Sequence, residues 1–149
     1  RTGKPYRCGI LWWNLRDGWP ILSDAITDYF FSKKLAYYYI KRVQENAIVA
    51  VNDALEVIAV NDTFKPAEGK VEISDIEGGK VLFEADFKIP PNGKTLVGNV
   101  SGLPSERGML LIKYEIDGKK QLNHYLYGKP PFDLKKYREW AESLAIKRD

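Results

Sequence analysis

The strongest constraint on the fold is the alternation of apolar and polar residues over positions 81–89. Apolar side chains occupy every odd position of this segment, and charged residues occupy positions 80, 84, 86 and 88. Successive side chains of a β-strand point to opposite faces of the sheet, so the pattern predicts a strand with one buried and one solvated face. Gly78-Gly79 before the segment and Pro90-Pro91-Asn92-Gly93 after it are turn signals.

The same period of two recurs along most of residues 46–128. Further short strands are expected at Ile48–Val51, Leu55–Val60, Val71–Ile73, Lys94–Val100, Leu110–Ile116 and Gln121–Tyr127. Asn52-Asp53 and Asp117-Gly118 supply tight turns between them. About seven short strands of this spacing predict a mainly β protein, with an immunoglobulin-like antiparallel β-sandwich over residues 46–131.

Composition removes several classes of function. The chain of 149 residues has one cysteine (Cys8) and one histidine (His124), so we expect no intrachain disulfide, no metal centre and no cofactor. A net charge of +3 is too small to favour a nucleic-acid partner. No apolar run approaches the ~20 residues that would cross a membrane. Residues 1–5 contain no apolar stretch and no initiator Met, so a processed or cut chain without a signal peptide is expected, and its compartment is left unknown.

Two helices are expected outside the strand-rich region. Ser32 is a candidate cap for a helix over residues 33–44, with Lys41 and Arg42 near its end, where the helix dipole favours cations. After Pro130-Pro131, Asp133 can cap a short helix within residues 132–149. Both helices carry an apolar face that needs a surface to cover.

The aromatic residues are unevenly placed. Of 19 aromatic residues, ten lie in residues 1–40 and three in residues 41–113, which indicates two parts of different origin. Residues 9–15 are an apolar run without alternation, which is typical of a strand buried on both faces.

Motifs in both parts resemble a known family. The segment Gly9-Ile10-Leu11-Trp12-Trp13-Asn14-Leu15-Arg16-Asp17-Gly18-Trp19-Pro20 resembles the last barrel strand of β-mannosidase-like enzymes in glycoside hydrolase family 2. Asp28-Tyr29-Phe30, Lys33-Lys34 and Ala36-Tyr37-Tyr38 resemble the residues that lead into the last barrel helix of that family. Val60-Asn61-Asp62 and residues 123–130 resemble parts of the immunoglobulin-like domain that follows the barrel.

The resemblance implies a division of the chain and a role for each part. Residues 1–45 would be the last strand and helix of a catalytic (α/β)8 barrel, residues 46–131 an accessory sandwich, and residues 132–149 a C-terminal helix. Retaining glycosidases use two carboxylates roughly 5–5.5 Å apart. In this family both are glutamates on earlier barrel strands, so the chain would contain no catalytic residue and would be inactive alone. The rest of the barrel and a β-linked sugar would be its partners.

The same resemblance selects four candidate substrate-binding residues. Trp13 would stack on a sugar ring in the parent enzyme, although either Trp12 or Trp13 could instead fill the barrel core. Asp17 and Trp19 would line the same pocket or orient its loop, and Asn14 is the fourth candidate. Asp17 in Asp-Gly also suits an ordinary turn. His124 is expected to be a packed or surface residue and not a catalyst.

Two other functions remain open from the sequence. The sandwich could be a stand-alone carbohydrate-binding module, although residues 46–128 contain no tryptophan. It could also be an immunoglobulin-like interaction domain, which would leave the Trp-Trp…Asp-x-Trp-Pro segment without an explanation. An apolar segment separated from its barrel exposes a patch, so dimerisation through residues 9–31 is also expected.

Overall fold

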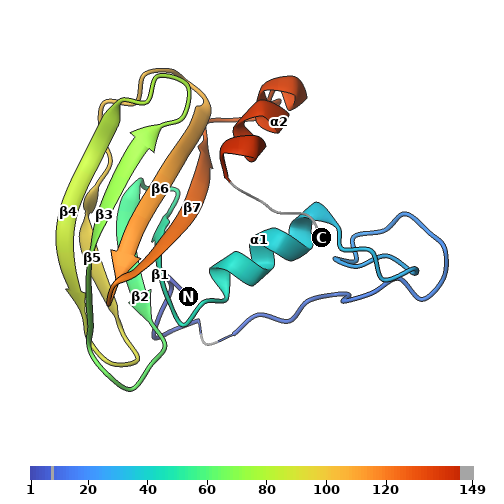
Figure 1. Ribbon diagram of the computed structural model, residues 1–149, viewed down its shortest axis with the longest axis horizontal. Helices are drawn as coiled ribbons and strands as arrows, with labels where there is room; N and C mark the ends of the chain where they lie inside the picture. Colours follow the sequence, from blue (N-terminus) through green and yellow to red (C-terminus); the bar gives the residue numbers. More distant parts are fainter. Residues whose placement is uncertain (8, 145–149) are drawn as a thin grey trace.

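A computed structural model describes residues 1–7 and 9–144, which form a two-layered β body with two helices beside it (Figure 1). The elements in chain order are α1 (Leu35–Val43), β1 (Ala47–Val51), β2 (Glu56–Asn61), β3 (Ala67–Asp75), β4 (Val81–Ile89), β5 (Lys94–Asn99), β6 (Gly108–Ile116), β7 (Lys119–Tyr127) and α2 (Leu134–Ser143). Neither helix has the length and apolar character that crossing a lipid bilayer demands, as judged over these described ranges.

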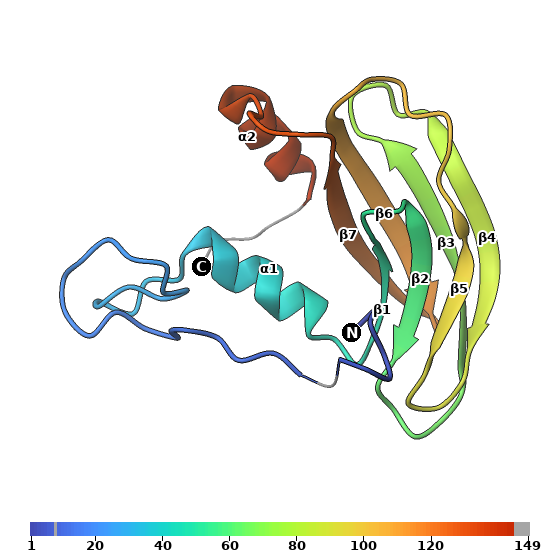
Figure 2. The same cartoon turned by 180° about the vertical axis from the view of Figure 1, so that it is seen from behind.

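The strands form two antiparallel sheets. One sheet has the order β1-β2-β5 and the other has the order β4-β3-β6-β7. Contacts of β4 with β5 and of β1 with β6 and β7 bring the sheets face to face, as the turned view in Figure 2 also shows. The prediction of a mainly β, sandwich-like fold with about seven antiparallel strands is therefore confirmed. Its immunoglobulin-like type and the domain boundaries stay predictions.

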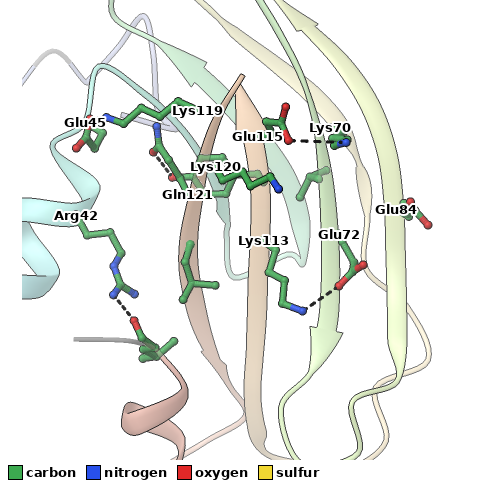
Figure 3. A pocket seen from close by; sticks show the side chains of 14 residues that line it. Arg42, Glu45, Lys70, Glu72, Glu84, Lys113, Glu115, Lys119, Lys120 and Gln121 are labelled. Carbon is green, nitrogen blue, oxygen red and sulfur yellow. Dashed lines mark hydrogen bonds and ion pairs between the residues drawn. The ribbon is translucent and has the colours of Figure 1, made fainter. Parts of the chain in front are cut away.

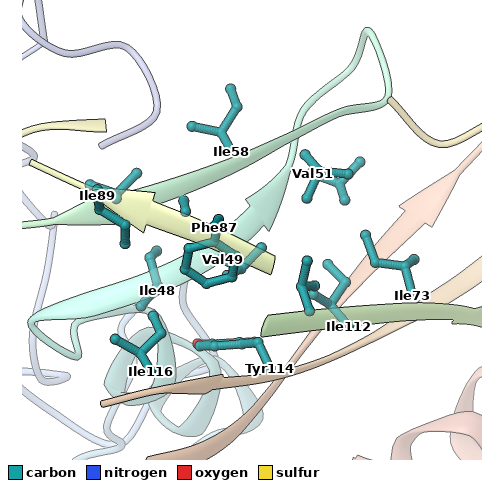
Figure 4. Close-up of a cluster of buried hydrophobic side chains, with 14 of the residues drawn as sticks. Ile48, Val49, Val51, Ile58, Ile73, Phe87, Ile89, Ile112, Tyr114 and Ile116 are labelled. Atoms are coloured by element: carbon teal, nitrogen blue, oxygen red, sulfur yellow. The ribbon is translucent and has the colours of Figure 1, made fainter. Parts of the chain in front are cut away.

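The core lies between the two sheets (Figure 4). Val49 and Val57 come from the three-stranded sheet, Ile73 and Ile112 come from the four-stranded sheet, and all four are fully buried. Burying an aliphatic side chain of this kind contributes about 1.5–3 kcal/mol. Apolar packing on both inner faces therefore supplies the stability that a disulfide supplies in some sandwiches.

Helix α1 begins two residues later than expected and has a different cap. Its N-cap is Lys34, whose side chain makes no capping hydrogen bond. The predicted cap by Ser32 is wrong because Ser32 is held in a local turn by Asp28. The Ser32 backbone N–H donates to Asp28 Oδ1 (2.7 Å), and the Asp28 N–H donates back to the Ser32 carbonyl (2.9 Å).

Helix α2 is capped as predicted. Asp133 Oδ1 accepts hydrogen bonds from the backbone N–H groups of Lys135 (2.8 Å) and Lys136 (3.2 Å). The helix ends at Ser143, and residues 145–149 of the expected segment lie outside the described residues. It is linked to α1 by a hydrogen bond between the hydroxyls of Tyr39 and Tyr137 (2.6 Å).

The strand predicted over residues 9–15 is wrong for this chain. The nearest ladder contacts are isolated bridges that join Arg16 to Thr27 and Thr27 to Lys33. A strand buried on both faces requires neighbouring strands on both sides, and within the described residues no strand pairs with residues 9–15. Most side chains of residues 9–15 are consequently exposed, and Leu11 is 99% exposed.

Candidate functional site

The candidate site is the projecting loop, which we define as residues 9–34. It extends beyond the first turn of α1, at the end of that helix farther from the sheets (Figures 1 and 2). Eleven of the 16 exposed large hydrophobic residues found in the described parts belong to it: Ile10, Leu11, Trp12, Trp13, Leu15, Trp19, Ile21, Leu22, Tyr29, Phe30 and Phe31. An apolar concentration of this size marks an interaction or ligand-binding surface.

The interior of the projecting loop contains a buried ion pair as well as the buried apolar residues Ala25 and Ile26. Asp17 is 1% exposed, and its Oδ2 accepts a hydrogen bond from Lys34 Nζ at 2.9 Å in an ion pair. Ser23 Oγ donates to Asp17 Oδ1. Lys34 Nζ also donates to the carbonyl oxygen of Ser23 (3.0 Å). A buried carboxylate needs partners of this kind, because its desolvation is otherwise costly.

Backbone hydrogen bonds close the loop around this ion pair. The Asp17 N–H donates to the Thr27 carbonyl (3.1 Å), and the Thr27 N–H donates to the Leu15 carbonyl (3.1 Å). The Lys34 N–H donates to the carbonyl of Ile26 (3.0 Å), which is buried. The loop therefore has a defined conformation of its own without a strand.

The four predicted site residues differ in their accessibility. Trp13 is 86% exposed and Trp19 is 66% exposed, so both indoles can meet a ligand or a covering surface. Asn14 follows Trp13 through a cis peptide bond, and its Oδ1 is buried without a hydrogen-bond partner among the described residues. Asp17 is buried, which suits the loop-orienting role that we considered for it.

The projecting loop contains three carboxylates and no glutamate. They are Asp17, Asp24 and Asp28, and the first glutamate of the chain is Glu45. The hydrogen bond from Ser23, together with the bond and charge of Lys34, lowers the pKa of Asp17, which keeps it ionised and unsuited to donate a proton. Across residues 1–7 and 9–144, no group of three or more His, Cys, Asp or Glu side chains is placed to hold a metal ion.

A second concave surface lies on the outer face of the four-stranded sheet (Figure 3). This groove has a volume of about 840 Å³, and α1 contributes Arg42 to its wall, with Glu45 just beyond the end of that helix. Six of its nine charged lining residues form three ion pairs: Lys113–Glu72 at 3.3 Å, Lys70–Glu115 at 3.8 Å and Lys119–Glu45 at 2.6 Å. Because most of the charges are paired across neighbouring elements, the groove resembles a solvated sheet face, and we assign it no ligand.

His124 packs between the sheet and α1. Its ring lies 4.7 Å from the ring of Tyr39, measured between centroids. Burial, assisted by the charge of Arg42, lowers the pKa of His124 to about 4, so the imidazole is neutral at neutral pH. This environment is in line with the expectation that His124 is a packing residue.

Two polar clusters were not predicted from the sequence. The resemblance places Lys34 before the last barrel helix but does not identify it as the partner of Asp17. A separation of 17 residues carries no periodic signal in the sequence. The other cluster is centred on Asp62, which forms ion pairs with Arg1 (2.6 Å) and Lys4. Lys4 also donates to Asn92 Oδ1 (2.9 Å), so residues 1–4 are fastened to the end of the sandwich.

Comparison with known proteins agrees with the resemblance. No family model matches the chain. It is 34% identical to β-mannosidase B of Aspergillus niger over 116 residues, which cover 62% of this chain and 14% of that protein. It is 30% identical to β-mannosidase B of Emericella nidulans over 142 residues, covering 78% and 17% respectively. The crystal structure of β-D-mannosidase from Dictyoglomus thermophilum matches with a TM-score of 0.61 and 28% identity, covering 78% of this chain and 16% of that chain.

These matches define a partial homology. The chain is homologous to a small part of the fungal enzymes and of the bacterial enzyme, and it spans less than a fifth of the length of the curated relatives that it matches.

Proposed function

Because the chain is homologous to a small part of β-mannosidases, we propose that it is the non-catalytic C-terminal region of a retaining, β-mannosidase-like glycoside hydrolase of family 2. In this proposal residues 46–131 are an accessory immunoglobulin-like sandwich, residues 1–45 complete the end of a catalytic (α/β)8 barrel, and residues 132–149 carry the C-terminal helix. Both catalytic glutamates then lie in a part of the enzyme outside this chain, which would not hydrolyse glycosides by itself.

The observation that carries this proposal is the exposed apolar surface of the projecting loop, which surrounds a buried ion pair. In the sandwich, apolar side chains such as Ile73 and Ile112 are buried and most charged ones face water, with Asp75 as a buried exception. In the loop, Asp17 is buried and Trp13 and Trp19 are exposed. A segment with this arrangement gains free energy when another surface covers it, because burial of apolar area is favourable. The rest of a barrel would be such a surface.

Trp13 and Trp19 are the proposed sugar contacts in the complete enzyme. An indole can stack on the apolar face of a sugar ring, and the exposure of both side chains leaves their faces available. Active sites of (α/β)8 barrels lie at the carboxyl ends of the strands, which is where the resemblance puts these residues. Asn14 is proposed as a neighbouring polar contact.

Two assays test the proposal. The purified chain of 149 residues should show no turnover of an aryl-β-mannoside above a buffer blank, and measurable turnover would contradict it. In β-mannosidase B of Aspergillus niger, deletion of the region homologous to this chain should abolish activity. Replacement of that region with this chain should restore it. A folded replacement protein as inactive as the deletion would count against the proposal.

The structure gives less support to a sugar-binding module. Among the seven strands, the exposed large hydrophobic residues are Val81 and Leu96, so the described strand surface has no exposed aromatic platform. Saturable binding of mannan oligosaccharides that persists after Trp13→Ala and Trp19→Ala substitution would favour that function instead.

We also propose that copies of the isolated chain associate through residues 9–31, which carry the exposed apolar surface. Light scattering over a range of concentrations should show dimerisation, and a strict monomer at high concentration would contradict it.

A further inference from the structure

We infer that Asp17 is a positioning residue whose carboxylate, paired with Lys34 and Ser23, fixes the projecting loop so that Trp13 and Trp19 keep their outward placement. This inference rests on the proposed function only for the role of the two tryptophans as sugar contacts. The conformation of the loop can be measured in the isolated chain, whatever enzyme the chain belongs to.

The hydrogen bonds of Asp17 join three separate points of the chain. Lys34 Nζ donates to Asp17 Oδ2 (2.9 Å) and to the Ser23 carbonyl (3.0 Å) at the same time. Ser23 Oγ donates to the other Asp17 oxygen and accepts from the Ala25 N–H (3.0 Å). The result is a closed circuit in which each of the three side chains has at least two bonds, so the loss of one partner weakens the rest.

Lys34 connects this circuit to the remainder of the fold. It is the N-cap residue of α1, so the carboxylate of Asp17 holds the loop against the first turn of the helix. Helix α1 is itself tied to α2 by the Tyr39–Tyr137 hydrogen bond. The orientation of the projecting loop is therefore set by its attachment to α1.

The position of Asp17 between the tryptophans explains why it can act on both. Trp13 lies four residues before Asp17 and Trp19 lies two residues after it. The backbone N–H of Asp17 is bonded to the Thr27 carbonyl, which fixes the chain direction between the two indoles. A direct sugar contact by Asp17 would require exposure of its oxygens, and the residue is instead enclosed with both oxygens engaged.

Amide hydrogen exchange in the 149-residue chain tests the inference. The reporters are the backbone amides of positions 27 and 34, which are bonded inside the loop, and the reference is the amide of Ile112 in β6. In Asp17→Asn and in Lys34→Met, we expect exchange at both reporter positions to accelerate at least tenfold, with Ile112 unchanged. The matched control is Asp24→Asn, an exposed carboxylate of the same loop, which should leave all three amides unchanged.

A conservative variant separates positioning by the ion pair from a general packing role. Lys34→Arg keeps the cation and its donors, so it should retain most of the protection at Thr27 that Lys34→Met loses. The indole N–H resonances of Trp13 and Trp19 should shift in Asp17→Asn and not in Asp24→Asn. Unchanged exchange at Thr27 in Asp17→Asn would overturn the inference. Equal acceleration at Ile112 and Thr27 would also overturn it, because the role would then be global stability.

Discussion

Asn123 links the edge strands of the two sheets, and its truncation tests whether this link holds the sandwich together. Its Nδ2 donates to the Val49 carbonyl of β1 (3.0 Å), and its Oδ1 accepts from the backbone N–H of His124 (2.9 Å). The side chain is 6% exposed, so water cannot easily replace either partner. Asn123→Ala removes both bonds and leaves the Val49 carbonyl without this donor.

The expected cost follows from these two contacts. A typical hydrogen bond contributes a net of about 0.5–1.5 kcal/mol, and a buried group left without a partner costs about 1–3 kcal/mol. We therefore expect Asn123→Ala to lower the free energy of unfolding by about 2–4 kcal/mol. For a chain of this size each kcal/mol lowers the melting temperature by about 2–4 °C, which predicts a fall of roughly 4–16 °C.

Thermal and urea unfolding followed by circular dichroism at neutral pH measure this cost. The matched control is Asn99→Ala, an exposed asparagine at the end of β5, which should stay within about 0.5 kcal/mol of the wild type. A loss below about 1 kcal/mol for Asn123→Ala, or one no larger than that of Asn99→Ala, would refute the reasoning from the structure.

Three further predictions concern stability. Gly69→Ala should lower the free energy of unfolding in urea by about 3 kcal/mol or more, because its Cβ would lie 2.0 Å from a backbone carbonyl oxygen of β6. In the control Gly78→Ala, the nearest atom to the Cβ is 3.5 Å away, so the free energy of unfolding should change little. His124 has a folded-state pKa of about 4, below its ordinary 6.5, so the unfolded chain takes up a proton at a higher pH than the folded chain does. The free energy of unfolding should therefore fall as the pH drops from about 6.5 to about 4. His124→Gln should flatten this pH dependence of the urea midpoint. Burial opposes ionisation of Asp62, but the hydrogen bond from Lys4 and the charges of Arg1 and Lys4 outweigh it and lower the pKa of Asp62. The contribution of Asp62 to the free energy of unfolding is therefore present above the ordinary carboxyl pKa of 3.8 and should be lost as the pH falls below it. Asp62→Asn should remove this loss, and an unchanged pH dependence of stability in acid would contradict the ion pairs.

The strands could be predicted because their signal is local and repeated. Alternation indicates which face of β4 is buried, and Phe87 and Ile89 are buried as that pattern requires. The same pattern is wrong for Val81, which is 48% exposed, because the β3–β4 register shifts between Ile73 and Ser74. The hairpin turn at Asp117-Gly118 could also be predicted from the sequence. Both residues have positive φ angles, 49° and 81°, a conformation that aspartate tolerates and glycine favours.

The errors have a common physical origin, since each concerns a contact whose partner the sequence does not indicate. Ser32 has the right residue type for a helix cap, but its backbone hydrogen bonds with Asp28 hold it in a turn, and the helix starts only after Lys34. The run at residues 9–15 has the composition of an interior strand, yet strand formation depends on neighbouring strands. The pairing of Asp17 with Lys34 joins positions in a loop without any period, so only the folded chain reveals it.

The two parts of the molecule expose different kinds of residue, and this contrast carries the functional argument. On β3 and β6, Glu72 and Lys113 face water while Ile73 and Ile112 fill the core, as expected for a stable sheet with one solvated face. In the projecting loop, Asp17 of the ion pair is buried and the indoles of Trp13 and Trp19 are exposed. A loop stabilised only by its own packing would be expected to bury its aromatic side chains. The conformation of the projecting loop is nevertheless specific, because Asp17 requires its two partners. A defined conformation that keeps apolar groups in water is understandable where those groups have a surface to cover, and this is the role that we propose for the loop in a larger enzyme.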